Sequence, residues 1–172
     1  MTIFFYGCVT MDGYLADKNH RIDWLHEIGT SEETGYADFY AQMDVLIMGR
    51  KTYDEIKDME DLESFYVGTR NIVFTHQEKI KNPLFEAASG DILEFISQIP
   101  KDKNIWIVGG NTLVGPLLDA NKIDKIYLQI APVLLGAGVP LFTQKEGLKR
   151  FHLLETNQYG QFAELVLERI KE

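Results

Sequence analysis

The sequence contains a single cysteine and too few basic residues to balance its acidic ones. Because Cys8 has no second cysteine to pair with, no internal disulfide can form, and a reducing cytoplasm is the simplest expected location. The 17 Lys and Arg residues face 26 Asp and Glu residues, which gives a formal net charge of −9. The basic residues form no stripe of the kind that a nucleic-acid surface needs, so we expect no nucleic-acid partner.

Long hydrophobic runs are also lacking. The longest apolar runs have about six residues, far fewer than the roughly 20 that cross a bilayer as a helix, so we expect no membrane partner. The N-terminal run Thr2–Val9 has no basic residues before it and is typical of a strand rather than a signal peptide. The length of 172 residues, 45% of them hydrophobic, predicts a single domain over residues 1–172 with one full core.

Apolar runs of strand length alternate with amphipathic segments along the first two thirds of the sequence. The predicted strands cover residues 2–9, 44–48, 71–75, 84–87, 104–110, 125–131, 151–157 and 161–170. The last two alternate like the arms of an antiparallel hairpin around the short segment Gln158–Gly160. This order predicts an α/β fold of three layers, α/β/α, with a mixed, mostly parallel central sheet and a C-terminal antiparallel hairpin.

Helical patterns occupy several of the connections. The predicted helices cover residues 30–43, 52–56, 92–99 and 111–120. Thr30 and Glu33 have the spacing of a capping box at the start of the first helix, and Asp91 is expected to cap the third. Pro116 is expected to bend the last one. The polar segment Lys57–Gly68 is predicted to be a surface loop.

Two of the predicted strands end in glycine. LIMGR ends with Gly49 and Arg50, and WIVGG ends with Gly109 and Gly110. Where parallel strands form a sheet, ligands bind beyond the carboxyl ends of the strands, where helices begin. Glycine lets a ligand approach the backbone closely, and the N–H groups of the first helical turn attract anions.

We therefore expect the two glycine ends to lie side by side and to bind the two phosphates of a dinucleotide. Arg50 adds a planar guanidinium that can hold a further phosphate through two hydrogen bonds. A simpler interpretation is that each glycine serves only its turn, because strand–helix junctions often need a positive φ. Neither segment matches the glycine patterns of the standard dinucleotide and mononucleotide folds.

Several segments together resemble a known family. VLIMGRKTYDEI, RNIVFT, IWIVGGNTL and FAELVLERI occur in the order seen in dihydrofolate reductases. VTMDGYLA and IAPVLLGAGVPLF look more like the reductase domain of riboflavin biosynthesis, which has the same fold. The chain is identified as a member of the dihydrofolate-reductase-like superfamily on its riboflavin-reductase side. The resemblance implies NADPH binding, hydride transfer to a C=N bond of a pterin-like or pyrimidine-like small molecule, and a homodimer.

The resemblance also implies where the cofactor binds. By position, the cofactor-binding residues are Cys8, Gly49, Arg50, Thr52, Thr75, His76, Gly109, Gly110, Asn111 and Thr112. Arg50 would favour the 2′-phosphate of NADPH over NADH, with Thr75 and His76 near that phosphate. The backbone of Cys8 would lie near the nicotinamide, under a mobile loop formed by residues 10–25.

Two carboxylates are candidates for the proton donor that reduction of a C=N bond needs. Counting back from LIMGR places Glu33 where dihydrofolate reductases carry their acidic residue, although Glu33 also completes the capping box. Asp12 is the second candidate, and it could instead cap the turn at Gly13. Thr69 stands where the folate enzymes hold an arginine for the glutamate tail, with Arg70 displaced by one, which argues for a smaller substrate than dihydrofolate.

Two other functions stay open at this point. The chain could be a catalytically inactive dinucleotide-binding protein that acts as a sensor or scaffold, or a flavin-binding oxidoreductase, although no flavin motif is present. A nucleophilic role for Cys8 is not expected, because the residue lies in the middle of an apolar strand. No metal site is expected either, since the His and acidic residues between His20 and Glu27 lack a recognised ligand spacing.

Overall fold

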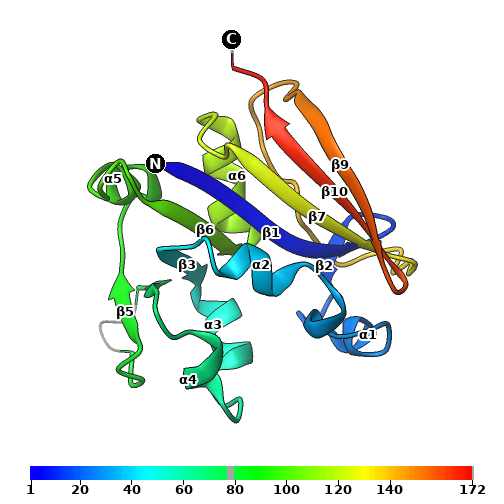
Figure 1. Ribbon diagram of the computed structural model, residues 1–172, viewed down its shortest axis with the longest axis horizontal. Helices are drawn as coiled ribbons and strands as arrows, with labels where there is room; N and C mark the ends of the chain where they lie inside the picture. The colour runs from blue at the N-terminus through cyan, green and yellow to red at the C-terminus, as the bar shows by residue number, and fades with distance from the viewer. Residues whose placement is uncertain (77–79, 172) are drawn as a thin grey trace.

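The computed structural model describes residues 1–76 and 80–171 and contains an eight-stranded sheet (Figure 1). The strands are β1 (Thr2–Thr10), β3 (Val45–Gly49), β4 (Arg70–Phe74), β5 (Phe85–Ala88), β6 (Asn104–Gly109), β7 (Lys125–Ala131), β9 (Phe151–Tyr159) and β10 (Phe162–Arg169). Their order across the sheet is β5-β4-β3-β6-β1-β7-β10-β9. All neighbouring pairs from β5 to β7 are parallel, whereas β10 is antiparallel to β7 and to β9. The predicted mixed, mostly parallel sheet with a C-terminal hairpin is confirmed.

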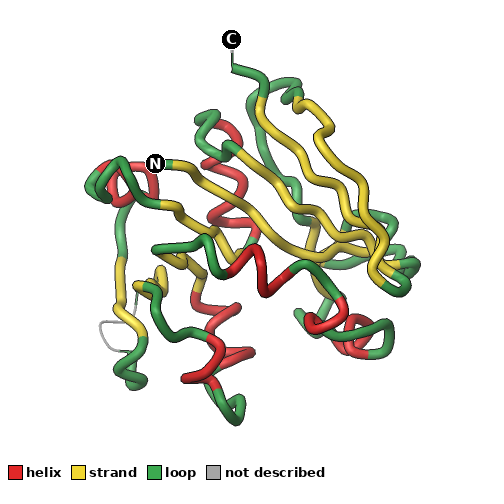
Figure 2. The backbone as a smooth tube through the Cα atoms, in the orientation of Figure 1, coloured by secondary structure: helices red, strands yellow, loops and turns green. Residues whose placement is uncertain are grey.

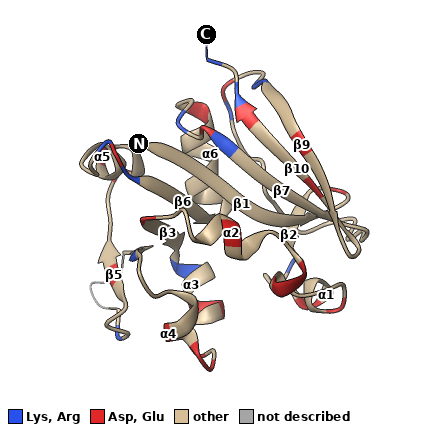
Figure 3. Ribbon diagram, in the orientation of Figure 1, with Lys and Arg blue, Asp and Glu red and all other residues tan. Residues whose placement is uncertain are grey.

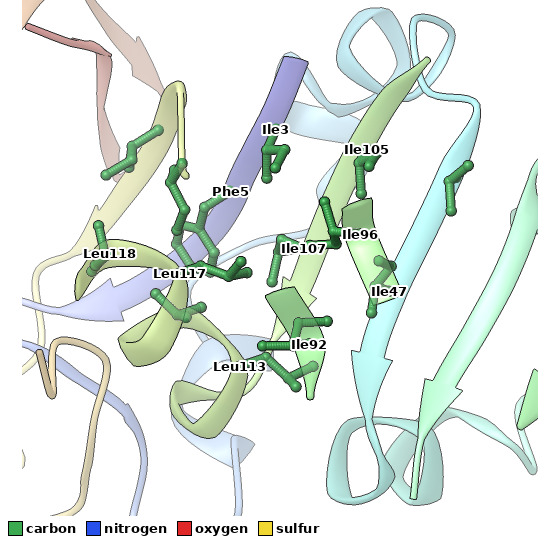
Figure 4. Packing of buried hydrophobic residues seen from close by; sticks show 14 of the residues in the cluster. Ile3, Phe5, Ile47, Ile92, Ile96, Ile105, Ile107, Leu113, Leu117 and Leu118 are labelled. Carbon is green, nitrogen blue, oxygen red and sulfur yellow. The ribbon is translucent and has the colours of Figure 1, made fainter. Parts of the chain in front are cut away.

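Helices cover both faces of the sheet, as Figure 2 shows by colour. They are α1 (Asp23–His26), a 3₁₀ turn η1 (Ser31–Glu33), α2 (Tyr36–Tyr40), α3 (Arg50–Ile56), α4 (Leu62–Phe65), α5 (Ile92–Ser97) and α6 (Asn111–Asp119). The α5 and α6 face buries an aliphatic cluster in which side chains of β1, β3 and β6 point at both helices (Figure 4). The cluster is built mainly from isoleucine, leucine and valine, which suit the pleated surface of a parallel sheet.

The opposite face buries an aromatic cluster. Phe4, Tyr6 and Trp106 of the sheet pack against Phe39 of α2, with ring centroids 4.6 to 6.0 Å from that of Phe39. Aromatic pairs in such tilted and edge-on arrangements stabilise a core beyond the area they bury. The two clusters fix the sheet between its helical layers, so the carboxyl ends of β3, β6 and β1 are held as one rigid edge.

The predicted helix over residues 30–43 is interrupted. The structure has η1 and then α2, separated at Thr34 and Gly35. The Thr34 hydroxyl donates to the Ser31 carbonyl at 2.7 Å instead of pointing to solvent. A Cβ at Gly35 would lie 2.9 Å from the Tyr159 hydroxyl of the C-terminal hairpin, so the close approach of a distant strand requires glycine where a helix disfavours it.

One further expectation needs correction. The segment 57–68 is not only a surface loop, because it contains α4, and both Leu62 and Tyr66 are buried in the aromatic cluster. A two-stranded sheet of β2 (Tyr14–Ala16) and β8 (Val139–Pro140) also forms beside the main sheet. These strands are too short to show an alternating pattern in the sequence. The capping of α5 by Asp91 is confirmed, since its carboxylate accepts from the backbone N–H groups of Leu93 and Glu94.

Candidate functional site

The two glycine ends lie side by side at one edge of the sheet. β3 and β6 are parallel neighbours, and Met48 is paired with Gly109. A Cβ placed on Gly49 would lie 3.7 Å from both the Gly109 carbonyl oxygen and the Gly110 nitrogen. The geometric prediction on which the sequence argument depends is therefore confirmed. We name the segment from Gly49 to Thr52 the first junction, and the segment from Gly109 to Thr112 the second junction.

The first junction supplies side chains. Gly49 is extended, and α3 begins at Arg50. The Arg50 Nε donates to the Asp54 carboxylate at 2.9 Å, and its guanidinium carbon lies 5.7 Å from the centre of the Tyr53 ring. The hydrogen bond to Asp54 raises the pKa of Arg50. Arg50 is thus directed along α3, onto a surface cavity of about 610 Å³ that Lys57 and Lys81 also line.

The other cofactor-binding residues predicted on the side of the first junction also lie near the carboxyl edge of the sheet. The Thr52 hydroxyl is 3.8 Å from the position that a Cβ on Gly109 would take, so Thr52 faces the second junction. Thr75 and His76 follow β4, whose Phe74 is paired with Gly49. Thr75 is buried and its backbone N–H donates to Ala88, whereas His76 is exposed.

The second junction supplies backbone. Gly109 has a φ of 139° and is joined to Gly110 by a cis peptide bond, and α6 begins at Asn111. The Asn111 amide donates to the Pro140 carbonyl at 3.0 Å, which fixes the start of the helix. The first N–H groups of any α-helix have no acceptor within the helix, and the helix dipole favours an anion there. Thr112 is exposed in this first turn.

Beyond Phe5, the backbone of β1 on the side of the second junction has no partner strand among the described residues. The β1–β6 ladder ends at Phe5 and Ile107, whereas the β1–β7 ladder continues to Thr10. Within the described residues, Cys8 is therefore paired with β7 but not with β6. Burial raises the pKa of the Cys8 thiol to about 12, so the thiol is inert at neutral pH and only the backbone of this residue is suited to a ligand.

The two predicted proton donors are both hydrogen-bond acceptors. The Glu33 carboxylate is exposed and accepts from the Thr30 backbone N–H at 2.9 Å, as a capping box requires. The Asp12 carboxylate accepts from the Thr10 hydroxyl at 2.6 Å and from the Gly136 backbone N–H at 2.7 Å. These hydrogen bonds, the one from Thr10 first, lower the pKa of Asp12. That direction is the opposite of the raised pKa expected for a proton donor, and Asp12 instead joins the end of β1 to the 133–136 loop.

A row of polar side chains near Cys8 was not predicted from the sequence. Cys8, Gln129, Glu164 and Asn157 are direct cross-strand partners on β1, β7, β10 and β9. Direct partners point to one face of a sheet. Gln129 Nε2 donates to Glu164 at 3.2 Å and Asn157 Nδ2 donates to it at 3.3 Å, while only 2% of Glu164 is exposed.

The row continues into the segment that carries Glu33. Gln129 Nε2 also donates to the Tyr6 hydroxyl at 2.7 Å, and Tyr6 donates to the Thr34 hydroxyl at 3.2 Å. Burial raises the pKa of Tyr6 to about 12, so the phenol stays neutral. Glu164 forms no ion pair with a described Lys or Arg. A signal was present in the sequence, because Glu164 shares the alternating phase of Phe162 and Val166, which are both buried.

The segment between β1 and η1 covers this edge. Trp24 of α1 packs with Ala131 and Phe162, and Cys8 lies against this cluster. The indole Nε1 of Trp24 is buried and has no hydrogen-bond partner among the described residues. A buried donor without a partner is uncommon and often marks a place for water or a ligand. Trp24 is thus packed at this edge, and its Nε1–H has no partner among the described residues.

Two absences apply to the part of the chain that the structure describes. No group of three or more His, Cys, Asp or Glu side chains there could hold a metal ion. No helix there is long and apolar enough to cross a bilayer.

The strand order, the helices on both faces and the C-terminal antiparallel pair define a dihydrofolate-reductase-like fold. The crystal structure of a Shewanella sp. PV-4 protein, assigned provisionally to riboflavin biosynthesis, superposes with a TM-score of 0.86 at 24% identity. The match covers 99% of this chain and 100% of that one. RibD of Acinetobacter baumannii superposes with a TM-score of 0.74 at 17% identity, over 98% of this chain and 58% of its own.

Sequence comparison then identifies the family. The model of the RibD C-terminal domain matches residues 2–164, so the chain belongs to the RibD C-terminal domain family. The uncharacterized protein YyaP of Bacillus subtilis is 32% identical over 165 residues, which cover 88% of this chain and 86% of YyaP. YwjB of the same organism, also uncharacterized, is 30% identical over 162 residues, 93% of each chain. The predicted membership on the riboflavin-reductase side of the superfamily is confirmed.

Proposed function

We propose that the protein is an NADPH-dependent reductase that transfers a hydride to a C=N bond of a pterin-type or pyrimidine-type small molecule. The observation that carries the proposal is the contact between the two junctions, where Gly49 faces the Gly109 carbonyl and the Gly110 nitrogen. Membership of a reductase-domain family supports the same reaction class. Only glycine leaves the backbone of both strand ends open to a diphosphate.

The residues present fit the cofactor. A Cβ on Gly49 would occupy the space between the junctions, which is where a diphosphate would contact backbone N–H groups. Asn111 and Thr112 would contact that diphosphate from the start of α6, and Thr52 would do so from α3. Arg50, with Thr75 and His76 one strand further out, would hold the 2′-phosphate that distinguishes NADPH from NADH.

When bound, the nicotinamide would supply the hydride. The chain would supply position and exclude water: the backbone of Cys8 would orient the carboxamide, and the segment with Trp24 would cover the edge. The proton has three candidate sources. Glu33 is exposed beside Thr30, and Glu164 is buried in the polar row that includes Gln129. Asp12 is a weaker candidate, because its hydrogen bonds lower its pKa.

The surroundings of Arg70 support a substrate smaller than folate. Its Nη2 donates to the Glu86 carboxylate at 2.8 Å and its Nε to the same group at 3.1 Å. Thr69, which stands where the resemblance expects an arginine, contacts the Tyr40 hydroxyl at 3.0 Å. Neither residue therefore offers a free cation to the glutamate tail of a folate.

A thermal-shift comparison of NADPH with NADH tests the cofactor site. Binding to the native state alone adds about 2.7 kcal/mol of stability when the ligand is present at a hundred times its dissociation constant. We expect a clear shift with NADPH, a smaller one with NADH, and loss of this preference in Arg50→Ala. The absence of a shift with either nucleotide would contradict the proposal.

The binding-only alternative is favoured by one observation, namely that Glu33 and Asp12 are both engaged as acceptors. NADPH oxidation with a panel of dihydropterins and aminopyrimidine imines separates the two functions. Turnover that falls in Glu33→Gln or in Glu164→Gln, with NADPH binding retained, supports a reductase and names its carboxylate. NADPH binding without any turnover favours a sensor or scaffold.

We also propose that the protein is a homodimer. Two large apolar side chains of the segment after β7 are exposed, Leu134 at 65% and Phe142 at 42%. Exposed large apolar side chains are candidates for burial at an interface. Sedimentation equilibrium tests the proposal, and we expect twice the mass of one chain, with Leu134→Asp shifting the protein towards the monomer.

A further inference from the structure

A cavity of about 380 Å³ lies at the opposite end of the sheet from the two junctions. It is bounded by the end of α6, by the chain before β9 and by the end of β10, near the C-terminus in Figure 1. Because α6 begins at the second junction and a helix of nine residues is about 13 Å long, the cavity is separate from the proposed cofactor site.

The charge of the lining is opposite to that of the protein. Lys149, Arg150 and Arg169 line the cavity, and none of the acidic side chains in residues 1–76 and 80–171 does so. The whole sequence has a net charge of −9, so a lining with three cations is a local exception. Figure 3 shows both blue and red segments near the end of β10, so the basic character belongs to the cavity lining rather than to the whole surface there. A cavity with charge of one sign concentrates ligands of the opposite sign.

The three cations are only partly neutralised by the described residues. Arg169 donates from Nη2 to the Asp124 carboxylate at 3.0 Å, but its buried Nε has no partner among the described residues. Lys149 Nζ contacts two neutral acceptors, the Asp119 carbonyl at 3.1 Å and the Asn121 side-chain oxygen at 3.0 Å. Arg150 is exposed and forms no ion pair with a described residue.

The helix dipole has to be weighed against these charges. α6 ends at the cavity, and the negative end of its dipole would repel an anion. Lys149 offsets this effect, because its ammonium binds the Asp119 carbonyl in the last turn. An ammonium has three N–H donors, so one remains after the two contacts, together with the guanidinium of Arg150.

The wall below the cations is apolar. Phe151 at the start of β9 and the exposed side chain of Leu148 supply its apolar surface, whereas Leu118 of α6 and Ile123 also line it but are almost fully buried. Ligand sites of proteins have volumes of roughly 300 to 1,000 Å³ and combine an apolar wall with a few polar groups. The cavity thus has the size and the lining of a site for one small ring with an anionic group.

We propose that this cavity binds a small amphiphilic anion, with a phosphate or carboxylate held by Lys149, Arg150 and Arg169. The attached ring or short chain packs on the side chains of Leu148 and Phe151. The proposal does not depend on the reductase function, because no residue is shared with either junction.

Isothermal titration at constant ionic strength tests the site with four probes: phenyl phosphate, benzoate, inorganic phosphate and benzyl alcohol. We expect phenyl phosphate or benzoate to bind about tenfold more tightly than inorganic phosphate, because the ring is buried. The stronger of the two identifies the preferred anionic group. Benzyl alcohol should not bind detectably, since it lacks the charge. The absence of saturable binding by both aromatic anions would overturn the proposal.

Arg150→Gln is the informative variant, because Arg150 is exposed and its loss should leave the fold intact. We expect it to weaken binding of the aromatic anion about tenfold. Lys101→Gln makes the same charge change outside the cavity and should leave the affinity unchanged. Equal losses in both variants would indicate a general charge effect. Binding that is lost in Arg50→Ala but kept in Arg150→Gln would place the anion at the first junction. Either result would overturn the proposal.

Discussion

The first and second junctions are alike in sequence but require glycine for different physical reasons. Gly49 has φ −78° and ψ 164°, an extended conformation that any residue adopts. Gly109 has a φ of 139°, in the region that strongly favours glycine. At Gly49 the lack of a side chain leaves space between the two junctions, whereas at Gly109 it allows the backbone to adopt a positive φ. The reason for a glycine in a strand–helix motif can therefore be assigned only when its φ is known.

The two junctions also differ in what they offer a ligand. The first offers side chains, chiefly the guanidinium of Arg50, while the second offers the backbone at the start of a nine-residue helix. Backbone N–H groups bind any phosphate, whereas a planar guanidinium distinguishes phosphates by their position. We therefore expect the second junction to set the affinity for a dinucleotide and the first to set the choice between NADPH and NADH.

The largest effect is expected from Gly109→Ala. A non-glycine residue held at a φ of 139° is strained by about 1 to 3 kcal/mol. We expect the free energy of unfolding, measured with urea, to fall by that amount, and NADPH binding to be lost with it. An alanine variant as stable as the parent would show that the backbone path is not required, and the contrast between the junctions would fail.

Gly49→Ala should separate binding from stability. Its Cβ would meet the Gly109 carbonyl at 3.7 Å, an ordinary contact distance, so the free energy of unfolding should change by less than about 0.5 kcal/mol. NADPH affinity should fall about tenfold, because the methyl group enters the space between the junctions. Titration calorimetry and urea unfolding of the same preparation measure both quantities. Unchanged affinity would remove Gly49 from the proposed site.

The fold and the paired junctions could be predicted from sequence because both depend on local patterns. Apolar runs such as Val45–Met48 and a glycine just after them are visible within ten residues, and parallel neighbours bring such ends to one edge. The interruption of the predicted helix at Gly35 could not be predicted in this way. It depends on Tyr159, which lies on the C-terminal hairpin more than a hundred residues away.

Dependence on residues that are distant in sequence also explains why the polar row and the role of Asp12 could not be predicted. Gln129 and Glu164 become partners only through the register of β7 against β10, which no local pattern specifies. Asp12 follows β1, as predicted, but its role depends on the backbone of Leu135 and Gly136, more than 120 residues later. Residue types and strand ends are therefore readable from the sequence, whereas the partners that decide a carboxylate's pKa are not.

Arg50→Ala and Thr112→Ala test whether cofactor specificity depends on the side chains of the first junction and affinity on the backbone of the second. If the first junction sets specificity, Arg50→Ala should reduce the ratio of NADPH to NADH affinity about tenfold. Thr112→Ala should leave that ratio unchanged, because the backbone of the second junction contacts the phosphates that both nucleotides share. The two dissociation constants of each variant supply the test. A ratio altered equally in both variants would contradict the division of roles.

The smallest effect is expected from Asp54→Asn, which removes the ion pair of the first junction. The hydrogen bond from Arg50 lowers the pKa of Asp54. A carboxyl with a lowered pKa stabilises the fold above its unfolded pKa of about 4, and this contribution is lost as the pH falls through the lower folded value. The melting temperature of the parent should therefore exceed that of Asp54→Asn slightly at neutral pH, and the difference should vanish in acid. The difference should be small because both side chains are about one third exposed. A difference that persists in acid would mean that Asp54 stabilises α3 by something other than its charge.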